Sequence, residues 1–293
     1  MPAPRLNLPD PNDIRARMLK ILNQPALTPA SLNAALRLLA KYRSLLIQWE
    51  MVKRHGVIIQ GGPFAGMAFV DSGSEGAHVA KLLGCYEQEL HGCIEAVIAT
   101  GYGAVVNIGC ADGYYALGLA RRLPEARVHA FDIDPVGRGI CAELAARNGD
   151  AGRVTVGERF TPAMFAEFAG QKAFVMMDIE GAELELLGEA PRASLAGFDF
   201  IIECHDLPGT PVSAKLAGLL EQTHLTATIA NAMRPVELPA FLREVGHLDQ
   251  LLAVWEWRQS PTPWLVAASR ERPATPFWRA VTDASAPDTS VAP

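Results

Sequence analysis

The chain has 293 residues, of which 49% are hydrophobic and 20% charged, so we expect a packed globular core and not a disordered chain. The formal net charge is −6 and no block of Lys or Arg stands out, so we expect no general electrostatic binding of nucleic acid or of an anionic membrane. No apolar run reaches the roughly 18 residues that a membrane span needs, and the first residues lack the apolar region of a signal peptide.

The five cysteines are scattered along the chain, and none forms a Cys-x-x-Cys pair. Their odd number argues against a disulfide framework, and their spacing argues against a zinc ribbon. The pattern therefore indicates a reducing compartment, and we expect the protein to be cytoplasmic.

The first hundred residues divide into two segments of different character. Residues 1–55 are expected to form a helical extension, in which Thr28, Pro29 and Ser31 are typical of the start of a second helix. In residues 56–100, short apolar runs between glycines predict strands or a loop-rich lid, followed by a helix. The leucine-rich and alanine-rich helices of the extension are expected to pack either on the protein's own sheet or on a second subunit, which would make a homodimer.

From residue 103 onward, short apolar runs alternate with helical patterns. This alternation predicts an α/β fold, Rossmann-like and doubly wound, with helices on both faces of a parallel sheet. The candidate strands are 104–108, 127–133, 153–156, 173–179, 198–204 and 224–230, with two more within 251–269 around a Ser-Pro-Thr-Pro turn. We expect an antiparallel last strand in a mostly parallel, seven-stranded sheet spanning 101–270, and a flexible tail over 271–293.

A turn of small residues, NIGCADGYY (107–115), follows the first of these strands. It lacks the G-x-G-x-x-G of a dinucleotide fold and the lysine of a phosphate-binding loop. With Ala111 counted as a small residue, the pattern from Gly109 to Gly113 is G-x-A-x-G. Any tight strand-to-helix turn favours glycine, so this turn alone leaves a purely structural role open.

Asp132 ends the second candidate strand, where nucleotide-binding folds place an acid that binds a ribose. The next helix has its own start signals, because Asp134 can cap it and Pro135 suits its first turn. Asp132 is therefore expected to be free to accept hydrogen bonds from hydroxyl groups. Its alternative roles are a solvated acid or a second cap.

The stretch VVNIGCADGYYALGLARRLPEARVHAFDIDP (105–135) resembles the first two motifs of class I S-adenosylmethionine-dependent methyltransferases. The resemblance implies S-adenosylmethionine as cofactor, with the glycine turn near its amino-acid end and Asp132 on its ribose. Ala111 departs from the more usual glycine. The cofactor-binding residues expected on this basis are Asn107, Gly109, Cys110, Ala111, Gly113, Asp132, Ile133, Glu158 and Asp178, with Tyr86 and Glu87 from the preceding helix.

A second resemblance is more specific. MMDIEGAELELL (176–187), followed by IIECHD (201–206), is similar to the FkbM-type methyltransferases, many of which methylate hydroxyl groups. It implies O-methylation of a small-molecule acceptor such as a sugar or a natural product, although N-acceptors stay open. The two resemblances together cover roughly residues 104–206.

A hydroxyl acceptor must lose its proton, which a positioned base or a bound metal can promote. The candidate catalytic residues, at the ends of the fourth and fifth strands, are His205, Asp178 and Glu203. Imidazole titrates near neutral pH, so His205 is the candidate general base, the alternative being an ordinary loop histidine. Asp178, Glu203 and Asp206 could instead bind Mg²⁺, and Glu203 could orient the acceptor by hydrogen bonds. Glu183 is expected to have a structural role.

Two other functions stay open at this point. A nicotinamide-dependent reductase is disfavoured, because the chain lacks both G-x-G-x-x-G after the first strand and a Tyr-x-x-x-Lys pair. A methyltransferase fold without activity, serving as a binding or scaffold protein, is disfavoured by Asp132 and the D-x-E-G stretch, but the sequence does not exclude it.

Overall fold

A computed structural model gives the fold. It describes residues 10–71, 77–206, 209, 211–231, 235–258, 260 and 262–286. Two helices come first, α1 (Pro11–Leu22) and α2 (Pro29–His55). Thr28 caps α2, because its hydroxyl accepts from the Ser31 N–H and the Ser31 hydroxyl accepts from the Thr28 N–H. The start signal read from the sequence at this position is therefore confirmed.

The sheet has seven strands in the order β3-β2-β1-β4-β5-β7-β6, and only β7 runs antiparallel to its neighbours. The expected mostly parallel sheet with an antiparallel last strand is thus confirmed. The strands are β1 (Ala104–Ile108), β2 (Arg127–Phe131), β3 (Val154–Gly157), β4 (Ala173–Met177), β5 (Phe198–Glu203), β6 (His224–Ile229) and β7 (Trp264–Ser269). β1, β4, β5 and β7 are buried along their whole length, as expected of central strands covered on both faces.

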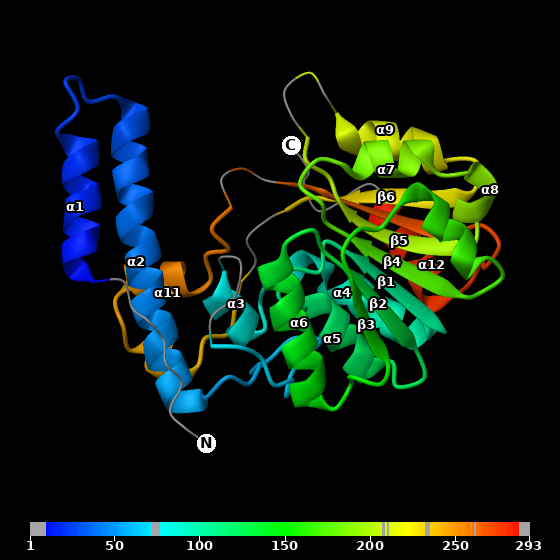
Figure 1. Ribbon diagram of the computed structural model, residues 1–293, viewed down its shortest axis with the longest axis horizontal. Helices are drawn as coiled ribbons and strands as arrows, with labels where there is room; N and C mark the ends of the chain where they lie inside the picture. The colour runs from blue at the N-terminus through cyan, green and yellow to red at the C-terminus, as the bar shows by residue number, and fades with distance from the viewer. Residues whose placement is uncertain are drawn as a thin grey trace.

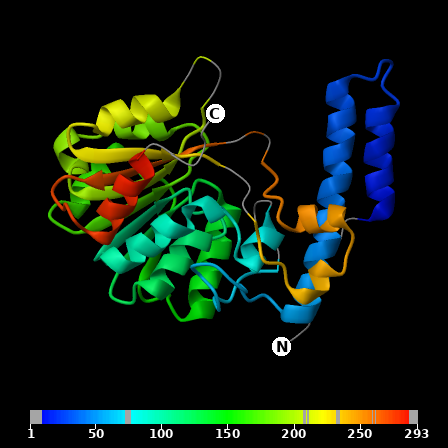
Figure 2. The same ribbon diagram turned by 180° about the vertical axis from the view of Figure 1, so that it is seen from behind.

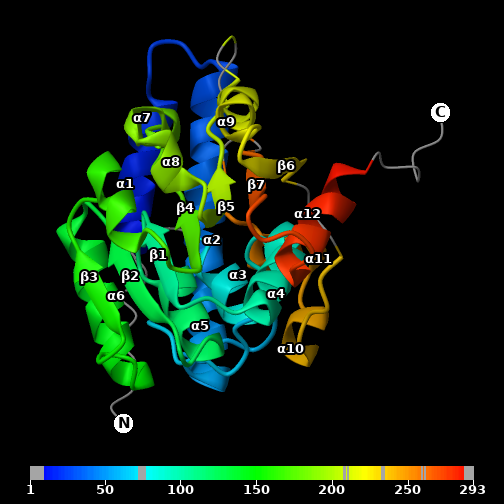
Figure 3. The same cartoon turned by 90° about the vertical axis from the view of Figure 1, so that its right-hand side faces the viewer.

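Helices cover both faces of the sheet, and each face has its own hydrophobic core (Figure 3). One face carries α4 (His91–Thr100), α5 (Tyr114–Arg122), α6 (Pro135–Asn148) and α12 (Pro276–Ser285). The other face carries the 3₁₀ segment η2 (Pro162–Phe168), α7 (Glu183–Glu189), α8 (Arg192–Leu195) and α9 (Val212–Leu220). Because the first five strands in spatial order are parallel, their carboxyl ends meet at one edge of the sheet, where open α/β folds bind ligands.

The α1–α2 hairpin stands to one side of the sheet, as Figures 1 and 2 both show. α3 (His78–Leu83) lies between it and the sheet (Figure 1), and η1 (Gln88–Leu90), α10 (Ala240–Arg243) and α11 (His247–Ala253) complete this part of the molecule. α2 packs against α3 and α11. Within the described part of the chain, no helix combines the length and the apolar character that crossing a membrane requires.

Two expectations about the C-terminal part were wrong. The segment expected to start a closing pair of strands forms α11, followed by chain without regular secondary structure over 254–258, and only β7 is a strand. The expected flexible tail contains α12, which buries Phe277 and Val281 against the sheet. Thr275 caps α12 by accepting from the Trp278 N–H. The rest of the expected tail, 287–293, lies outside the described residues.

Candidate functional site

The turn after β1 is held in shape by backbone contacts that only small residues permit. A Cβ atom on Gly109 would come 1.6 Å from the Asp178 carbonyl oxygen, so the ends of β1 and β4 meet as closely as they do because residue 109 is glycine. Gly113 starts α5 with φ +86°, and a Cβ there would lie 2.9 Å from the Cys141 Sγ. Ala111 also adopts a left-handed conformation, with φ 44°. The turn therefore uses small residues for steric reasons at each of these positions.

Asp132, which directly follows the neighbouring strand β2, accepts a hydrogen bond from this turn. One carboxylate oxygen accepts from the Ala111 N–H at 2.7 Å, and the other accepts from the Asp134 N–H at 2.8 Å. Asp134 caps α6, as expected, through the N–H groups of Val136 and Gly137. Asp132 is thus not the free acid that the sequence suggested. Each carboxylate oxygen still has a second lone pair, so the side chain can accept further hydrogen bonds.

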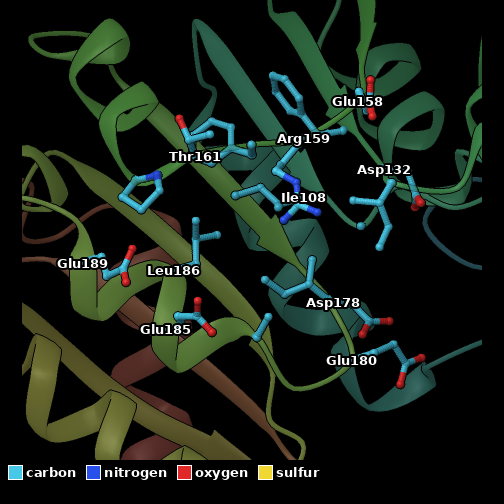
Figure 4. Close-up of a pocket in the computed structure, with 17 residues that line it drawn as sticks. Ile108, Asp132, Glu158, Arg159, Thr161, Asp178, Glu180, Glu185, Leu186 and Glu189 are labelled. Atoms are coloured by element: carbon cyan, nitrogen blue, oxygen red, sulfur yellow. The ribbon is translucent and has the colours of Figure 1, made fainter.

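A cavity of about 440 Å³ opens at the carboxyl ends of β1, β2 and β4 (Figure 4). Asp178 and Glu180 lie together at one end of it, and Glu185 and Glu189 at another. Asp132, Ile133 and Glu158 also line it. A smaller cavity of about 30 Å³ adjoins it, since both are lined by Gly109 and Asp178.

The smaller cavity is lined by three buried polar atoms without hydrogen-bond partners among the described residues. They are Asn107 Oδ1, Asp178 Oδ1 and Trp264 Nε1. Buried polar groups are normally paired, so each of these atoms offers an unused acceptor or donor to a ligand. Lys81 and Asp112 line the same cavity and pair with each other at 2.9 Å, with both side chains almost fully buried.

His205 lies directly after β5 and is oriented by Glu183. Its Nδ1 is 3.0 Å from Glu183 Oε1, which also accepts from the N–H groups of Ile179 and Gly181. Burial opposes ionisation of Glu183, but His205 and the backbone N–H groups of Glu183 and Gly181 lower its pKa, so it is a carboxylate that accepts from Nδ1–H. The same hydrogen bond raises the pKa of His205 above its ordinary value. Glu183 thus has a structural role, as expected, and it also holds His205 in one orientation.

The other ring nitrogen of His205 faces carboxylates. Nε2 is 3.2 Å from Glu180 Oε2, 3.8 Å from Glu203 Oε2 and 3.9 Å from Asp178 Oδ1. Asp178, Glu203 and His205 each offer a ligand atom, and these atoms lie within 4.8 Å of one another, so the three side chains could hold a divalent cation. Asp206, expected as a metal ligand, instead accepts from the N–H and hydroxyl of Ser213 at the start of α9.

The guanidinium of Arg258 forms ion pairs with three carboxylates. It contacts Glu203 through Nη1, Glu87 through Nη2 at 2.6 Å and Glu256 through Nε at 3.0 Å. Tyr115 donates to Glu87, and Thr262 donates to Glu203. Residues from four separated segments of the chain therefore form one network beside Asp178.

Even with Arg258 present, this region has more buried acids than bases. Burial raises the pKa of Glu87 to about 8 against the opposing effect of Arg258. Burial and the neighbouring Glu203 raise the pKa of Asp178 well above its ordinary value. Burial likewise opposes ionisation of Glu203, but Arg258, Asp178 and Thr262 together lower its pKa. A site whose acids resist ionisation for lack of positive charge favours a cationic ligand.

The sequence identified part of the lining of the two cavities. Of the eleven expected cofactor-binding residues, all except Gly113 line one cavity or the other, and Gly113 shapes the turn between them. The lining residues that were missed include Lys81, Asp112 and Trp264 of the smaller cavity and Arg159, Phe160 and Thr161 of the larger one, and Arg258 and Thr262 beside the cavities were missed too. Asp112 lies inside the glycine turn, so its position in the sequence pointed to the site. The other missed residues lie in no recognisable motif.

No protein-family model matches the chain, and no curated protein matches it. Among solved structures, the O-methyltransferase TomG from Streptomyces achromogenes, in complex with SAM, is similar with 15% identity and a TM-score of 0.41, over 61% of this chain and 78% of TomG. TrmK from M. capricolum, in complex with S-adenosyl-homocysteine, has 12% identity and a TM-score of 0.41, over 61% and 68% of the two chains. The C-terminal domain of precorrin-6Y C5,15-methyltransferase from Rhodobacter capsulatus has 12% identity and a TM-score of 0.42, over 61% and 87%. Likenesses as weak as these assign no activity, substrate or cofactor to this chain.

Proposed function

We propose that the chain is an S-adenosylmethionine-dependent methyltransferase that methylates a hydroxyl oxygen of a small molecule. The observation that carries the proposal is the arrangement at the carboxyl edge of the sheet. Two adjoining cavities share Gly109 and Asp178, and the glycine turn and Asp132 lie on one side of that junction, with His205 on the other. The resemblance of residues 176–206 to the FkbM-type family supports a hydroxyl acceptor.

The residues present fit this cofactor. Asp132 has spare acceptor capacity for ribose hydroxyls, and Glu158 lies on the same cavity wall. The unpartnered Asn107 Oδ1 and Trp264 Nε1 offer an acceptor for an ammonium group and a donor for a carboxylate, respectively. The excess of buried acids around Asp178 suits a sulfonium charge. When bound, the cofactor supplies a methyl group that is already activated for displacement.

The chain's own residues then position the acceptor and remove its proton. Glu183 keeps a proton on Nδ1 of His205, so that Nε2 of the neutral ring is the acceptor for the hydroxyl proton. Glu180 lies 3.2 Å from Nε2 and stabilises the imidazolium once it forms. Asp178 and Glu203, on either side of His205, can hold further hydroxyl groups of the acceptor. Positioning of this kind is worth about 7–11 kcal/mol of a displacement barrier.

The test is calorimetric titration with S-adenosylmethionine and S-adenosylhomocysteine for three proteins: the wild type, Asp132→Ala and His205→Asn. We expect binding by the wild type, loss of at least about tenfold in affinity for Asp132→Ala because a charged acceptor is removed, and unchanged binding for His205→Asn. Acceptors would then be screened for methyl transfer with and without Mg²⁺, where His205→Asn should be slower by about 10²–10⁴-fold.

Each outcome has a distinct meaning. No binding of either ligand by the wild type, with or without candidate acceptors, would contradict the methyltransferase proposal. Binding without transfer to any acceptor would favour a scaffold protein. Transfer that is abolished by chelation and restored by Mg²⁺ would assign Asp178, Glu203 and His205 to a metal and remove the role of His205 as the base.

A further inference from the structure

A row of exposed leucines runs along α1 and α2 of the hairpin and continues on α11, which packs beside α2. These side chains expose between 39% and 67% of their surface. These leucines are Leu19, Leu22, Leu32, Leu36, Leu39, Leu248 and Leu251, and are called the leucine face below. Monomeric proteins rarely leave a contiguous apolar surface of several hundred Å² exposed.

The leucines of the hairpin turn to the same side. Ile14 in α1 and Ala35 in α2 are buried between the two helices. At 100° per residue, Leu22 is rotated by about 80° from Ile14, and Leu36 by about 100° from Ala35, in the same sense. In an antiparallel helix pair, equal rotations from the contact line bring side chains to one common side. The row is continued by Arg43, which pairs with Asp249 of α11 at 2.5 Å, so the leucines of α11 adjoin it.

Four of the basic side chains of the hairpin, Arg17, Lys20, Arg37 and Lys41, lie on its opposite side. Residues 11–55 contain eight Lys and Arg against two Asp and Glu, a formal charge of +6 within a chain of −6. Arg37 donates to the Trp257 carbonyl oxygen, and Lys41 lies over the Trp257 ring. Arg17 lies on this side too, because it is rotated by about 60° from Ile14 in the opposite sense to Leu22. An anionic lipid surface would need these cations beside the leucines, whereas on the leucine side Arg43 is already paired with Asp249.

We propose that two copies of the chain associate through their leucine faces, with the two hairpins forming a four-helix bundle. A surface that is mostly apolar and two helices wide can pack on its own copy, because Arg43 beside it is already paired with Asp249. Its several hundred Å² of exposed leucine is of the order of the ~800 Å² per partner that stable interfaces bury. Arg15 is exposed on the same side of α1, one turn before Leu19, so the contact must end there and leave its charge in water. The proposal is independent of the methyltransferase activity.

Sedimentation velocity of the full chain tests this proposal. The wild type should sediment with twice the mass of one chain at about 10 μM, since interfaces of this size bind with micromolar or tighter affinity. Leu36→Glu combined with Leu39→Glu should weaken self-association by about 100-fold or more, because charges would be buried in the contact. Ala34→Glu places the same charge on the other side of α2 and should leave the dimer intact. Circular dichroism would verify that all variants fold.

Two results would overturn the proposal. One is a wild type that stays monomeric, and the other is a double variant that stays dimeric. A monomer that pellets with phosphatidylserine vesicles, and does so only with Leu36 and Leu39 intact, would assign the leucine face to a lipid surface instead.

Discussion

The two sides of the carboxyl edge of the sheet are built in different ways. On the β1 and β2 side, a short turn takes its shape from small residues and from backbone N–H groups that donate to Asp132. On the β4 and β5 side, buried ionisable side chains form ion pairs with one another. Two of them, Arg258 and Glu87, come from distant parts of the chain. The first side depends on steric fit around one turn, whereas the second depends on charge balance between separate segments.

The difference has a physical consequence for robustness. The turn that takes its shape from small residues loses little when Ala111 becomes glycine, because the backbone N–H groups still donate to Asp132. A buried charge network loses much more, because removing one ion leaves its partners uncompensated in a medium that cannot solvate them. Substitutions on the two sides should therefore change the free energy of unfolding by different amounts and for different reasons.

The largest effect is expected for Arg258→Met, which removes the cation between Glu87, Glu203 and Glu256. We expect the free energy of unfolding to fall by about 3–5 kcal/mol at neutral pH, measured by urea denaturation. The loss should shrink at acidic pH, because Glu203, whose pKa Arg258 lowers, then takes up a proton and no longer needs the cation. The control is Arg54→Met, whose exposed pair with Glu50 should contribute about 0.3–0.5 kcal/mol. Equal losses for the two variants would show that the network is not coupled through Arg258.

A smaller effect is expected for Glu183→Gln, which keeps the shape of the side chain but removes the charge that orients His205. His205 must be neutral to accept a proton, and its pKa is raised mainly by Glu183, so wild-type kcat should rise with pH through that raised pKa. In the variant the midpoint should move to lower pH, although Glu180, Asp178 and Glu203 still face the ring. The plateau should fall by about 10–100-fold, as for other residues that orient a reacting group.

The control for this profile is Glu185→Gln, which changes an exposed acid on the same helix and should leave the midpoint in place. An unshifted midpoint in Glu183→Gln would mean that the profile reports a group other than His205.

The smallest effect is expected on the β1 side, for Ala111→Gly. Ala111 has a left-handed backbone, which an L side chain disfavours, so glycine should raise the free energy of unfolding by about 0.5–1 kcal/mol. Ala142→Gly, at an exposed position of α6 with ordinary helical geometry, should instead lower it by about 1 kcal/mol. Destabilisation by both changes, measured by the same denaturation, would contradict strain at Ala111.

The sequence predicted the sheet well because each strand is a short apolar run with its own local boundaries. β1 has the bounds that were predicted for it, and β2 ends two residues earlier because Asp132 leaves the strand to accept backbone hydrogen bonds. The segment around Trp255 and Trp257 misled the prediction. Its alternation of large residues matches a strand, but these rings pack against Arg37 and Lys41 of α2 and not on a sheet neighbour.

The site was predictable only where its residues follow the strands directly. Asp132, Asp178, Glu203 and His205 were found because parallel strands bring their carboxyl ends together. Arg258 and Lys81 were not, since nothing in their local sequence says which distant carboxylate they will meet. The helix α12 could have been found, because Thr275-Pro276 is a helix start and Phe277 and Val281 are spaced for one buried face.

The segment 255–258 connects the N-terminal hairpin to the interior of the site. Trp257, which has an unfavourable φ of 63°, is held by Arg37, Lys41 and Ser44 of α2, and the next residue is Arg258. A truncated chain that begins after α2 would therefore lose the anchor of the guanidinium that balances Glu87 and Glu203. The hairpin is thus no removable accessory, and a shortened form of this chain should retain it.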